Sequence, residues 1–189
     1  PDQSYGGAVW IDAVPQLTGA NIPFVIRLRV VLLRDTGAPL APFNAWQIIQ
    51  GLETVGLRMK QHCSNAEKVV TFLETQKKVQ NVIYPTNHQG EIKERALKYM
   101  KGGYGSLVGM DVGTKENGAK FIDNLKMLYH VANIGDARSL AIHPATTTHS
   151  QLNDKELLAA GVTPGYVRLS IGIEHPDDII ADIKQALAA

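Results

Sequence analysis

The feature that most constrains this chain is a helical repeat of apolar residues that extends from about residue 43 to residue 76. Apolar or small side chains recur there every three or four residues, which is the period of one face of an α-helix. A single helix of this length would extend roughly 50 Å at about 1.5 Å per residue. Because helices longer than about 25 residues are unusual inside a compact domain, the repeat predicts a helix that connects two bodies. The repeat consists of Trp46, Ile49, Leu52, Gly56, Met59, Cys63, Ala66, Val70 and Leu73.

Two glycines inside this repeat leave a second description open. A kink near Gly51 or Gly56 would divide the segment into two helices. Isolated glycines are tolerated in helices, so we expect one continuous or gently bent helix. Pro42 is well placed in its first turn, where the missing N–H of proline costs no hydrogen bond.

The residues before the repeat predict an arm and a short helix. Glycines and prolines punctuate residues 1–23, which predicts an extended arm that needs a partner surface to become ordered. Apolar residues at helical spacing predict a helix from Phe24 to Arg34, and Gly37 is placed to end it.

Beyond residue 76 short β-prone segments alternate with helical ones. We expect strands at 79–84, 106–112, 129–132, 140–142 and 166–173. We expect helices at 91–100, around Phe121, Leu125 and Leu128, after a capping box formed by Asn153 and Glu156, and from Pro176 onward. Without regular βαβ spacing this order predicts an α+β fold, in which a small, mostly antiparallel sheet carries helices on one face and follows the long connecting helix.

Arg168 is the first candidate for a binding residue. Val167, Leu169 and Ile171 alternate onto one face of the predicted strand, so Arg168 and Ser170 lie on the other face. A guanidinium group there offers a planar fork to a carboxylate or a phosphate. On the pattern alone, a salt bridge to one of the 18 acidic residues of the chain is the commoner arrangement.

Polar groups also concentrate in residues 133–136 and 143–150. His143 and His149 are six residues apart, with no carboxylate or thiol at a familiar metal spacing, so we predict no metal site. His143 precedes Pro144 and is expected to be a strand-end histidine that bonds to backbone. Cys63 lies in the long helical repeat and is expected in the core.

Charge and cysteine content exclude some classes of partner. The net charge of +1 gives no basic field to gather nucleic acid. The most apolar run, residues 22–33, is interrupted by Pro23 and two arginines, which predicts no membrane span. The single cysteine cannot form an internal disulfide, which fits the cytoplasm.

The chain contains five motifs in order, at residues 34–46, 51–59, 133–140, 143–152 and 167–174. Together they resemble the carboxy-terminal part of the pyridoxal-phosphate-dependent enzymes of cysteine and methionine metabolism, and within that family they are most similar to the O-acetylhomoserine sulfhydrylases. The choice within the family depends mainly on Asn133 and on residues 143–152.

The resemblance also implies what this chain lacks. In the family the cofactor lysine and the phosphate-binding loop lie upstream of the motifs found here, and Lys98 falls where the family has a surface loop. The expected chain is therefore a fragment without a catalytic residue of its own and without bound cofactor. The implied division is residues 1–37 left over from the large cofactor-binding domain, 38–76 as the connecting helix, and 77–189 as the small carboxy-terminal domain of a fold-type I enzyme.

For the parent enzyme the resemblance implies replacement of the acetate of O-acetylhomoserine by sulfide or a thiol, which gives homocysteine with pyridoxal phosphate as cofactor. Arg168 matches the arginine that binds the substrate α-carboxylate, Asn133 a residue next to that carboxylate, and Thr148 a hydroxyl near the cofactor. The missing large domain and further copies of the parent chain are the implied protein partners. A fragment of a methionine γ-lyase or cystathionine γ-synthase, or a binding or assembly domain without chemistry, remains an alternative.

Overall fold

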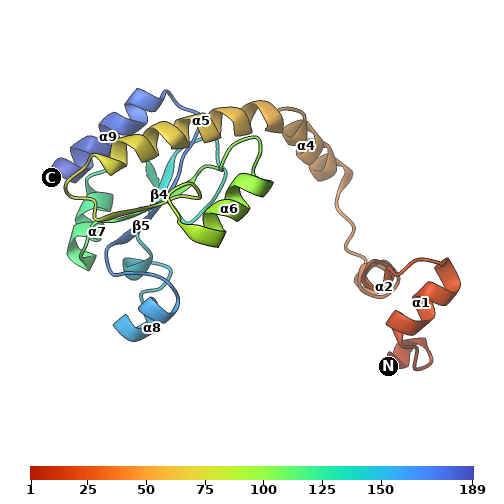
Figure 1. Cartoon of the computed structure of the whole chain (residues 1–189). Coiled ribbons are helices and arrows are strands. Elements are labelled where there is room, and N and C mark those ends of the chain that lie inside the picture. The colour runs from red at the N-terminus through yellow and green to blue at the C-terminus, as the bar shows by residue number, and fades with distance from the viewer. The chain divides into compact units, whose positions relative to one another are not determined.

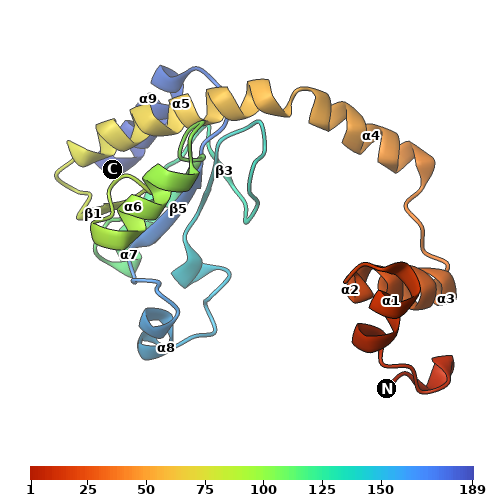
Figure 2. The ribbon, with the colours of Figure 1, turned by 45° about the vertical axis from the view of Figure 1, so that its right-hand side comes forward.

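The computed structural model describes all residues, 1–189, which form two compact units, Pro1–Leu52 and Glu53–Ala189. In the first unit a 3₁₀ turn η1 (Gln3–Tyr5) precedes α1 (Trp10–Thr18), α2 (Pro23–Arg27), a π-helical stretch η2 (Leu28–Leu33), α3 (Arg34–Thr36) and most of α4 (Pro42–Glu53) (Figures 1 and 2). No single helix of the chain is both long enough and apolar enough to cross a membrane, and only the bent pair Trp10–Thr18 with Pro23–Thr36 passes that test together.

The prediction of an extended arm over residues 1–23 is wrong for its central part. Residues 10–18 form α1 although Pro15 lies inside it. Val14 on this helix is almost fully buried, and the Trp10 ring packs edge-on against Tyr5 with ring centroids 5.1 Å apart. These contacts outweigh the helix-breaking tendency of proline that the sequence pattern emphasised.

Gly37 ends the helical stretch 23–36 as predicted. Its φ of 61° lies in the left-handed region, and its N–H donates to the carbonyl of Leu33 at 3.0 Å. A left-handed residue at this position closes a helix, and glycine adopts it without a Cβ penalty.

The expectation of one continuous or gently bent helix over residues 43–76 is wrong, because the repeat is divided into two helices, as the second description allowed. α4 ends at Glu53 and α5 (Val55–Glu74) begins after Thr54, whose ψ of 2° interrupts the helix between the two glycines. α5 buries seven residues between His62 and Leu73, whereas α4 buries none. An apolar helix with no buried side chain is typical of a surface that meets another protein body. The exposed apolar side chains of α4 are Phe43, Trp46, Ile48, Ile49 and Leu52.

The second unit is built on a five-stranded sheet. Its order is β1 (Asn81–Ile83), β2 (Leu107–Asp111), β5 (Tyr166–Ser170), β4 (Leu140–Ile142) and β3 (Tyr129–His130). The pairings β1–β2, β2–β5 and β5–β4 are antiparallel, and β3–β4 is parallel. The predicted α+β class with a mostly antiparallel sheet is therefore confirmed. The helices of this unit are α5, α6 (Gly90–Tyr99), α7 (Lys115–Asp123), α8 (Asp154–Ala159) and α9 (Pro176–Ala188), with a 3₁₀ turn η3 (Pro144–Thr146).

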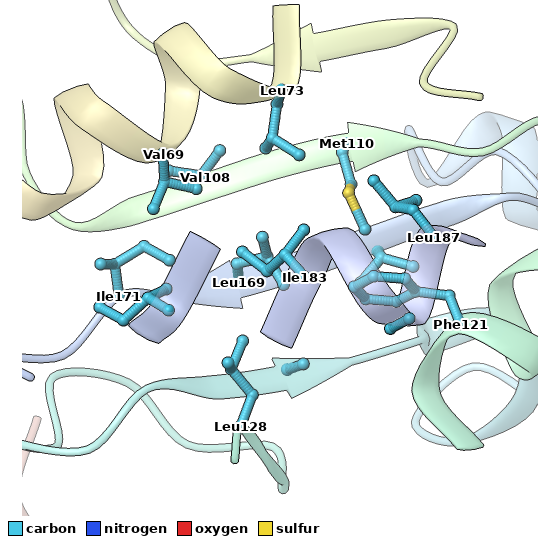
Figure 3. Packing of buried hydrophobic residues seen from close by; sticks show 14 of the residues in the cluster. Val69, Leu73, Val108, Met110, Phe121, Leu128, Leu169, Ile171, Ile183 and Leu187 are labelled. Carbon is cyan, nitrogen blue, oxygen red and sulfur yellow. The ribbon is translucent and has the colours of Figure 1, made fainter. Parts of the chain in front are cut away.

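The core lies on one face of the sheet. Alternate residues of β2 and β5 point to this face and are fully buried, beneath side chains of α5, α7 and α9 (Figure 3). Close packing of this kind provides most of the stabilisation of a domain of this size. One helix departs from the predicted single layer, since α6 and the opposite face of the sheet together line a groove. The labelled core residues include Val69, Leu73, Val108, Met110, Phe121, Leu169 and Ile183.

Two local predictions have different outcomes. The capping box at the start of α8 is confirmed, since Asn153 accepts the Glu156 N–H and Glu156 accepts the Asn153 N–H. The helix predicted around residues 121–128 ends earlier, at Asp123, so Leu125 and Leu128 lie in the turn that follows α7.

Asp182 on α9 holds that turn. Its carboxylate accepts the backbone N–H groups of Lys126, Met127 and Leu128 at 2.9, 2.9 and 3.0 Å. Burial raises the pKa of the Asp182 carboxyl, but these donors outweigh it, and the pKa lies below its ordinary value. Asp182 therefore stabilises the fold in its ionised form.

We expect Asp182→Asn to lower the free energy of unfolding by about 2–3 kcal/mol at pH 7, because an amide cannot accept all three N–H groups. The pKa of Asp182 is lower in the folded state than in the unfolded state. The carboxylate therefore contributes its full stabilisation at pH values above its unfolded pKa of about 4. This stabilisation is lost as the pH falls through the folded pKa. The stability gap between wild type and variant should therefore close below about pH 4. Urea unfolding at several pH values measures this gap.

Asp178→Asn on the same helix is the control, because Asp178 is exposed. Its effect should remain within about 0.5 kcal/mol. Equal stability of wild type and Asp182→Asn at pH 7 would contradict the role given to this carboxylate.

Candidate functional site

Arg168 lies in the middle of the sheet on the face opposite the core. It is paired with Gly109 of β2 and Ile142 of β4, while its neighbours Val167 and Leu169 are fully buried on the core face. The predicted alternation of this strand is confirmed. The Arg168 side chain is therefore carried by the most central strand and points away from the core helices.

The Arg168 guanidinium has no acidic partner. Its Nη2 donates to the backbone carbonyl of Asn133 at 3.1 Å, and its Nε is buried without a hydrogen-bond partner. The ion pairs of the structure involve other residues, so the alternative of an internal salt bridge is not what the structure shows. A buried charged donor without a partner is costly, and such a group is typical of a site that receives an anion.

A groove of about 500 Å³ adjoins Arg168 between α6 and the sheet. Its lining is mainly apolar and includes Ile83, Ile92 and Leu107. Tyr166 leans across Gly109, where a Cβ would lie 2.7 Å from the tyrosine Cε2. Burial raises the pKa of the Tyr166 hydroxyl, and the nearby Arg168 charge opposes this only in part. The phenol therefore stays neutral at pH 7. The cations of the groove are Arg168 and Arg95, and of these Arg95 is already paired with Glu91.

The structure brings Asn133 next to Arg168 through its backbone. Asn133 belongs to an exposed segment, residues 131–138, that runs beside the end of β5. The Gly135 N–H donates to Ser170 Oγ at 3.1 Å, and the Ile173 N–H donates to the Ala137 carbonyl at 2.9 Å. These bonds keep the segment against the strand that carries Arg168.

Thr148 is not joined to these two residues. It is exposed in the turns after η3, and its Oγ1 lies 2.9 Å from Nδ1 of His149. None of its hydrogen bonds reaches Arg168 or Asn133, so its place beside a cofactor remains a prediction.

His143 is a structural residue, as predicted. It is fully buried, and its Nε2 lies 2.8 Å from the Pro164 carbonyl, so Nε2 carries the proton and Nδ1 accepts from the Thr146 hydroxyl at 2.9 Å. Burial lowers the pKa of the imidazole, which keeps it neutral. No group of three or more metal-ligating side chains occurs in the chain, and Cys63 is buried as predicted.

The groove beside Arg168 includes no lysine among its lining residues. Lys98 is exposed on α6, with its Nζ 5.3 Å from the centre of the Tyr99 ring. The described residues thus provide an anion-binding arginine but no amine beside it that could hold an aldehyde cofactor covalently. A covalent link between such a cofactor and the protein would need an amine other than those lining this groove.

Residues important to this arrangement were not recognised from the sequence. Tyr166 and Glu174 flank the Arg168 strand segment, and Ser139 ends the neighbouring loop. The only local signal in the sequence is the glycine at position 172, since a glycine near a strand often marks a close approach of another segment. In the structure an added Cβ there would lie within 2.6 Å of atoms of Glu174, Ala137 and Arg138. Such crowding indicates a close approach of chain segments but does not reveal which ones.

Comparisons with known proteins agree on one family. The family model described as Cys/Met metabolism PLP-dependent enzyme matches residues 7–188. The chain is 47% identical over 192 residues to the O-acetyl-L-homoserine sulfhydrylase of Leptospira meyeri, covering 99% of this chain and 43% of that protein. It is 39% identical to the homocysteine/cysteine synthase of Saccharomyces cerevisiae, covering 98% of this chain and 43% of the relative.

A solved structure is similar over the whole chain. It is a putative O-acetylhomoserine (thiol)-lyase from Campylobacter jejuni that contains a pyridoxyl-lysine monophosphate. The TM-score is 0.85 at 42% identity, and the match covers 100% of this chain and 44% of that one. The chain thus spans less than half the length of the relatives that it matches.

Proposed function

The chain belongs to the pyridoxal-phosphate-dependent enzymes of cysteine and methionine metabolism, and on this basis we propose that it is the carboxy-terminal part of an O-acetylhomoserine sulfhydrylase. Such an enzyme replaces the acetate of O-acetylhomoserine by sulfide or a thiol, which gives homocysteine. The observation that carries the proposal is Arg168, a half-buried arginine with an unpartnered Nε in a chain that is 39–47% identical to sulfhydrylases and homocysteine synthases.

Arg168 binds the α-carboxylate of the amino-acid substrate in this proposal. Its planar fork can meet both carboxylate oxygens, and Nε is free to be one of the two donors. The Asn133 carbonyl accepts the Nη2 N–H and so orients the fork. We assign the Asn133 side chain to a contact with the substrate carboxylate. Thr148 is assigned to the surroundings of the cofactor.

Pyridoxal phosphate supplies the electron sink for this chemistry when it is bound. The residues described here contribute the binding and orientation of the substrate carboxylate. The cofactor lysine is placed in the upstream part of the parent protein, and the isolated chain is proposed to be inactive.

The partner of this chain is then the upstream large domain of the parent. The exposed apolar side chains of α4, such as Phe43 and Trp46, support a partner surface, because an apolar helix face is stable in water only when something covers it. We assign the parent to the cytoplasm and expect it to be a homo-oligomer.

Product analysis of the full-length protein tests the proposal. With O-acetylhomoserine and sulfide it should form homocysteine, and no α-keto acid should accumulate. A methionine γ-lyase would release an α-keto acid, and a cystathionine γ-synthase would require cysteine as the acceptor. The isolated chain incubated with pyridoxal phosphate should keep no cofactor absorbance after dialysis. If the chain were instead part of a binding or assembly protein without chemistry, the full-length protein would form neither homocysteine nor an α-keto acid.

A further inference from the structure

We propose that Glu174 is a positioning residue for Arg168, because it fastens the loop that holds the arginine side chain. The inference rests on the proposed function, since it assumes that Arg168 binds the substrate carboxylate. Glu174 lies six residues after Arg168, beyond the end of β5, and contacts the loop 131–139 with its side chain.

The Glu174 carboxylate binds both polar groups at the end of the loop. Its Oε1 accepts the Ser139 N–H at 2.6 Å, and its Oε2 accepts the Ser139 hydroxyl at 2.9 Å. The Ser139 Oγ in turn accepts the Gly172 N–H at 2.9 Å. Ser139 is fully buried, so its polar groups have no water to replace a lost partner.

Glu174 is itself held by helix α5. The side-chain amide of Asn65, which is fully buried, donates to the carbonyls of Gly172 at 3.0 Å and of Glu174 at 2.8 Å. Gln61 donates to Asn65 Oδ1 at 2.8 Å and so fixes the orientation of that amide. The Glu174 carboxylate therefore projects from a backbone whose position is set by a packed helix.

The loop 131–139 connects the Glu174 carboxylate to the Arg168 side chain. From Ser139 it runs back along the strand, where Ala137 accepts the Ile173 N–H and Gly135 donates to Ser170. It then reaches Asn133, whose carbonyl accepts Arg168 Nη2 at 3.1 Å. The loop thus follows the strand from Gly172 to Arg168, and Glu174 anchors its far end.

The absence of a side chain at residue 172 makes room for this anchor. An added Cβ at Gly172 would lie 2.2 Å from Glu174 Oε2 and 2.5 Å from the Ala137 carbonyl. The carboxylate and the loop fill the space that a side chain would occupy. This close approach indicates that the contact is built into the fold rather than formed by a flexible surface side chain.

Steady-state kinetics of the full-length holoenzyme tests the proposal. Glu174→Ala should raise the KM for O-acetylhomoserine about tenfold. Without Glu174 the loop and its Asn133 carbonyl become mobile, so the Arg168 guanidinium loses its alignment with the substrate carboxylate. The KM for sulfide and the bound pyridoxal phosphate should change less than about twofold. Glu174→Gln keeps one acceptor oxygen for the Ser139 N–H and should recover most of the loss.

Glu156→Ala is the matched control, because Glu156 also accepts a backbone N–H, that of Asn153 at 2.9 Å, at the start of α8. It should lower stability without changing the KM for the amino acid. An unchanged KM in Glu174→Ala, or an equal loss of cofactor, sulfide affinity and amino-acid affinity, would overturn the positioning role.

The two proposals can fail separately. If the wild-type protein does not convert O-acetylhomoserine, the proposed function fails. The Glu174 comparison is then made with dissociation constants for L-methionine and other α-amino acids, followed by the absorbance of the bound cofactor. Weaker binding of these carboxylates in Glu174→Ala, with recovery in Glu174→Gln, supports the positioning role, and unchanged binding refutes it.

Discussion

Replacing Arg168 by lysine in the full-length enzyme should raise the KM for O-acetylhomoserine by about ten- to hundredfold while pyridoxal phosphate stays bound. Lysine keeps the positive charge but loses the planar two-point contact, and it cannot also donate to the Asn133 carbonyl as the guanidinium Nη2 does at 3.1 Å. A charge-assisted hydrogen bond in a desolvated site contributes about 1.5–3 kcal/mol, which corresponds to this range of affinity. Initial rates at varied amino-acid concentration, with the cofactor quantified by absorbance, give both values.

Arg27→Lys is the matched control for this substitution. Arg27 lies on α2, outside the groove, and pairs with Asp2 at 3.5 Å, where its side chain is 48% exposed. A lysine can replace it there, and the KM should stay within about twofold because surface ion pairs contribute little. If Arg168→Lys behaves like this control, Arg168 does not bind the substrate carboxylate.

Gly118→Ala should destabilise the second unit by about 3 kcal/mol, a large effect for the addition of one methyl group. Gly118 lies on α7, where a Cβ would be 2.4 Å from Nε2 and 2.6 Å from Cδ2 of His143. The imidazole cannot move aside, because it is fully buried and held by the Pro164 carbonyl and the Thr146 hydroxyl. Chemical unfolding of wild type and variant measures the difference.

The same substitution at Gly51 is the comparison. Gly51 also lies in a helix, α4, but no atom comes within 4 Å of its added Cβ. Alanine there should stabilise the helix by about 1 kcal/mol, since glycine is the poorer helix former. The two substitutions should change the free energy of unfolding in opposite directions, because the space around the two glycines differs. An unchanged free energy of unfolding in Gly118→Ala would show that α7 and His143 can move apart to accept a methyl group.

The sequence was sufficient for features that depend on short-range patterns. Alternation of Val167 and Leu169 with Arg168 predicted which face the arginine occupies, and the structure confirms it. The capping box of Asn153 and Glu156 has both expected hydrogen bonds. In each case the physical cause lies within a few residues of the chain, so periodicity and capping chemistry are enough.

Features that depend on distant contacts could not be predicted in the same way. The pairing of Arg168 with Asn133 and that of Glu174 with Ser139 both join residues 35 positions apart. No local pattern indicates that the loop 131–138 lies beside β5. Helix α1 was missed for a related reason, because Val14 is buried by packing that outweighs the local effect of Pro15.

In the proposed function Arg168 binds the α-carboxylate of the amino-acid substrate, and a crystal structure of the full-length protein with O-acetylhomoserine or an unreactive analogue would show this contact. We expect two hydrogen bonds of about 2.7–2.9 Å from the guanidinium, with Nε as one donor, to the two carboxylate oxygens. The bond from Nη2 to the Asn133 carbonyl should persist. A substrate carboxylate bound to another cation, with Arg168 paired to a carboxylate of the protein, would contradict this role of Arg168.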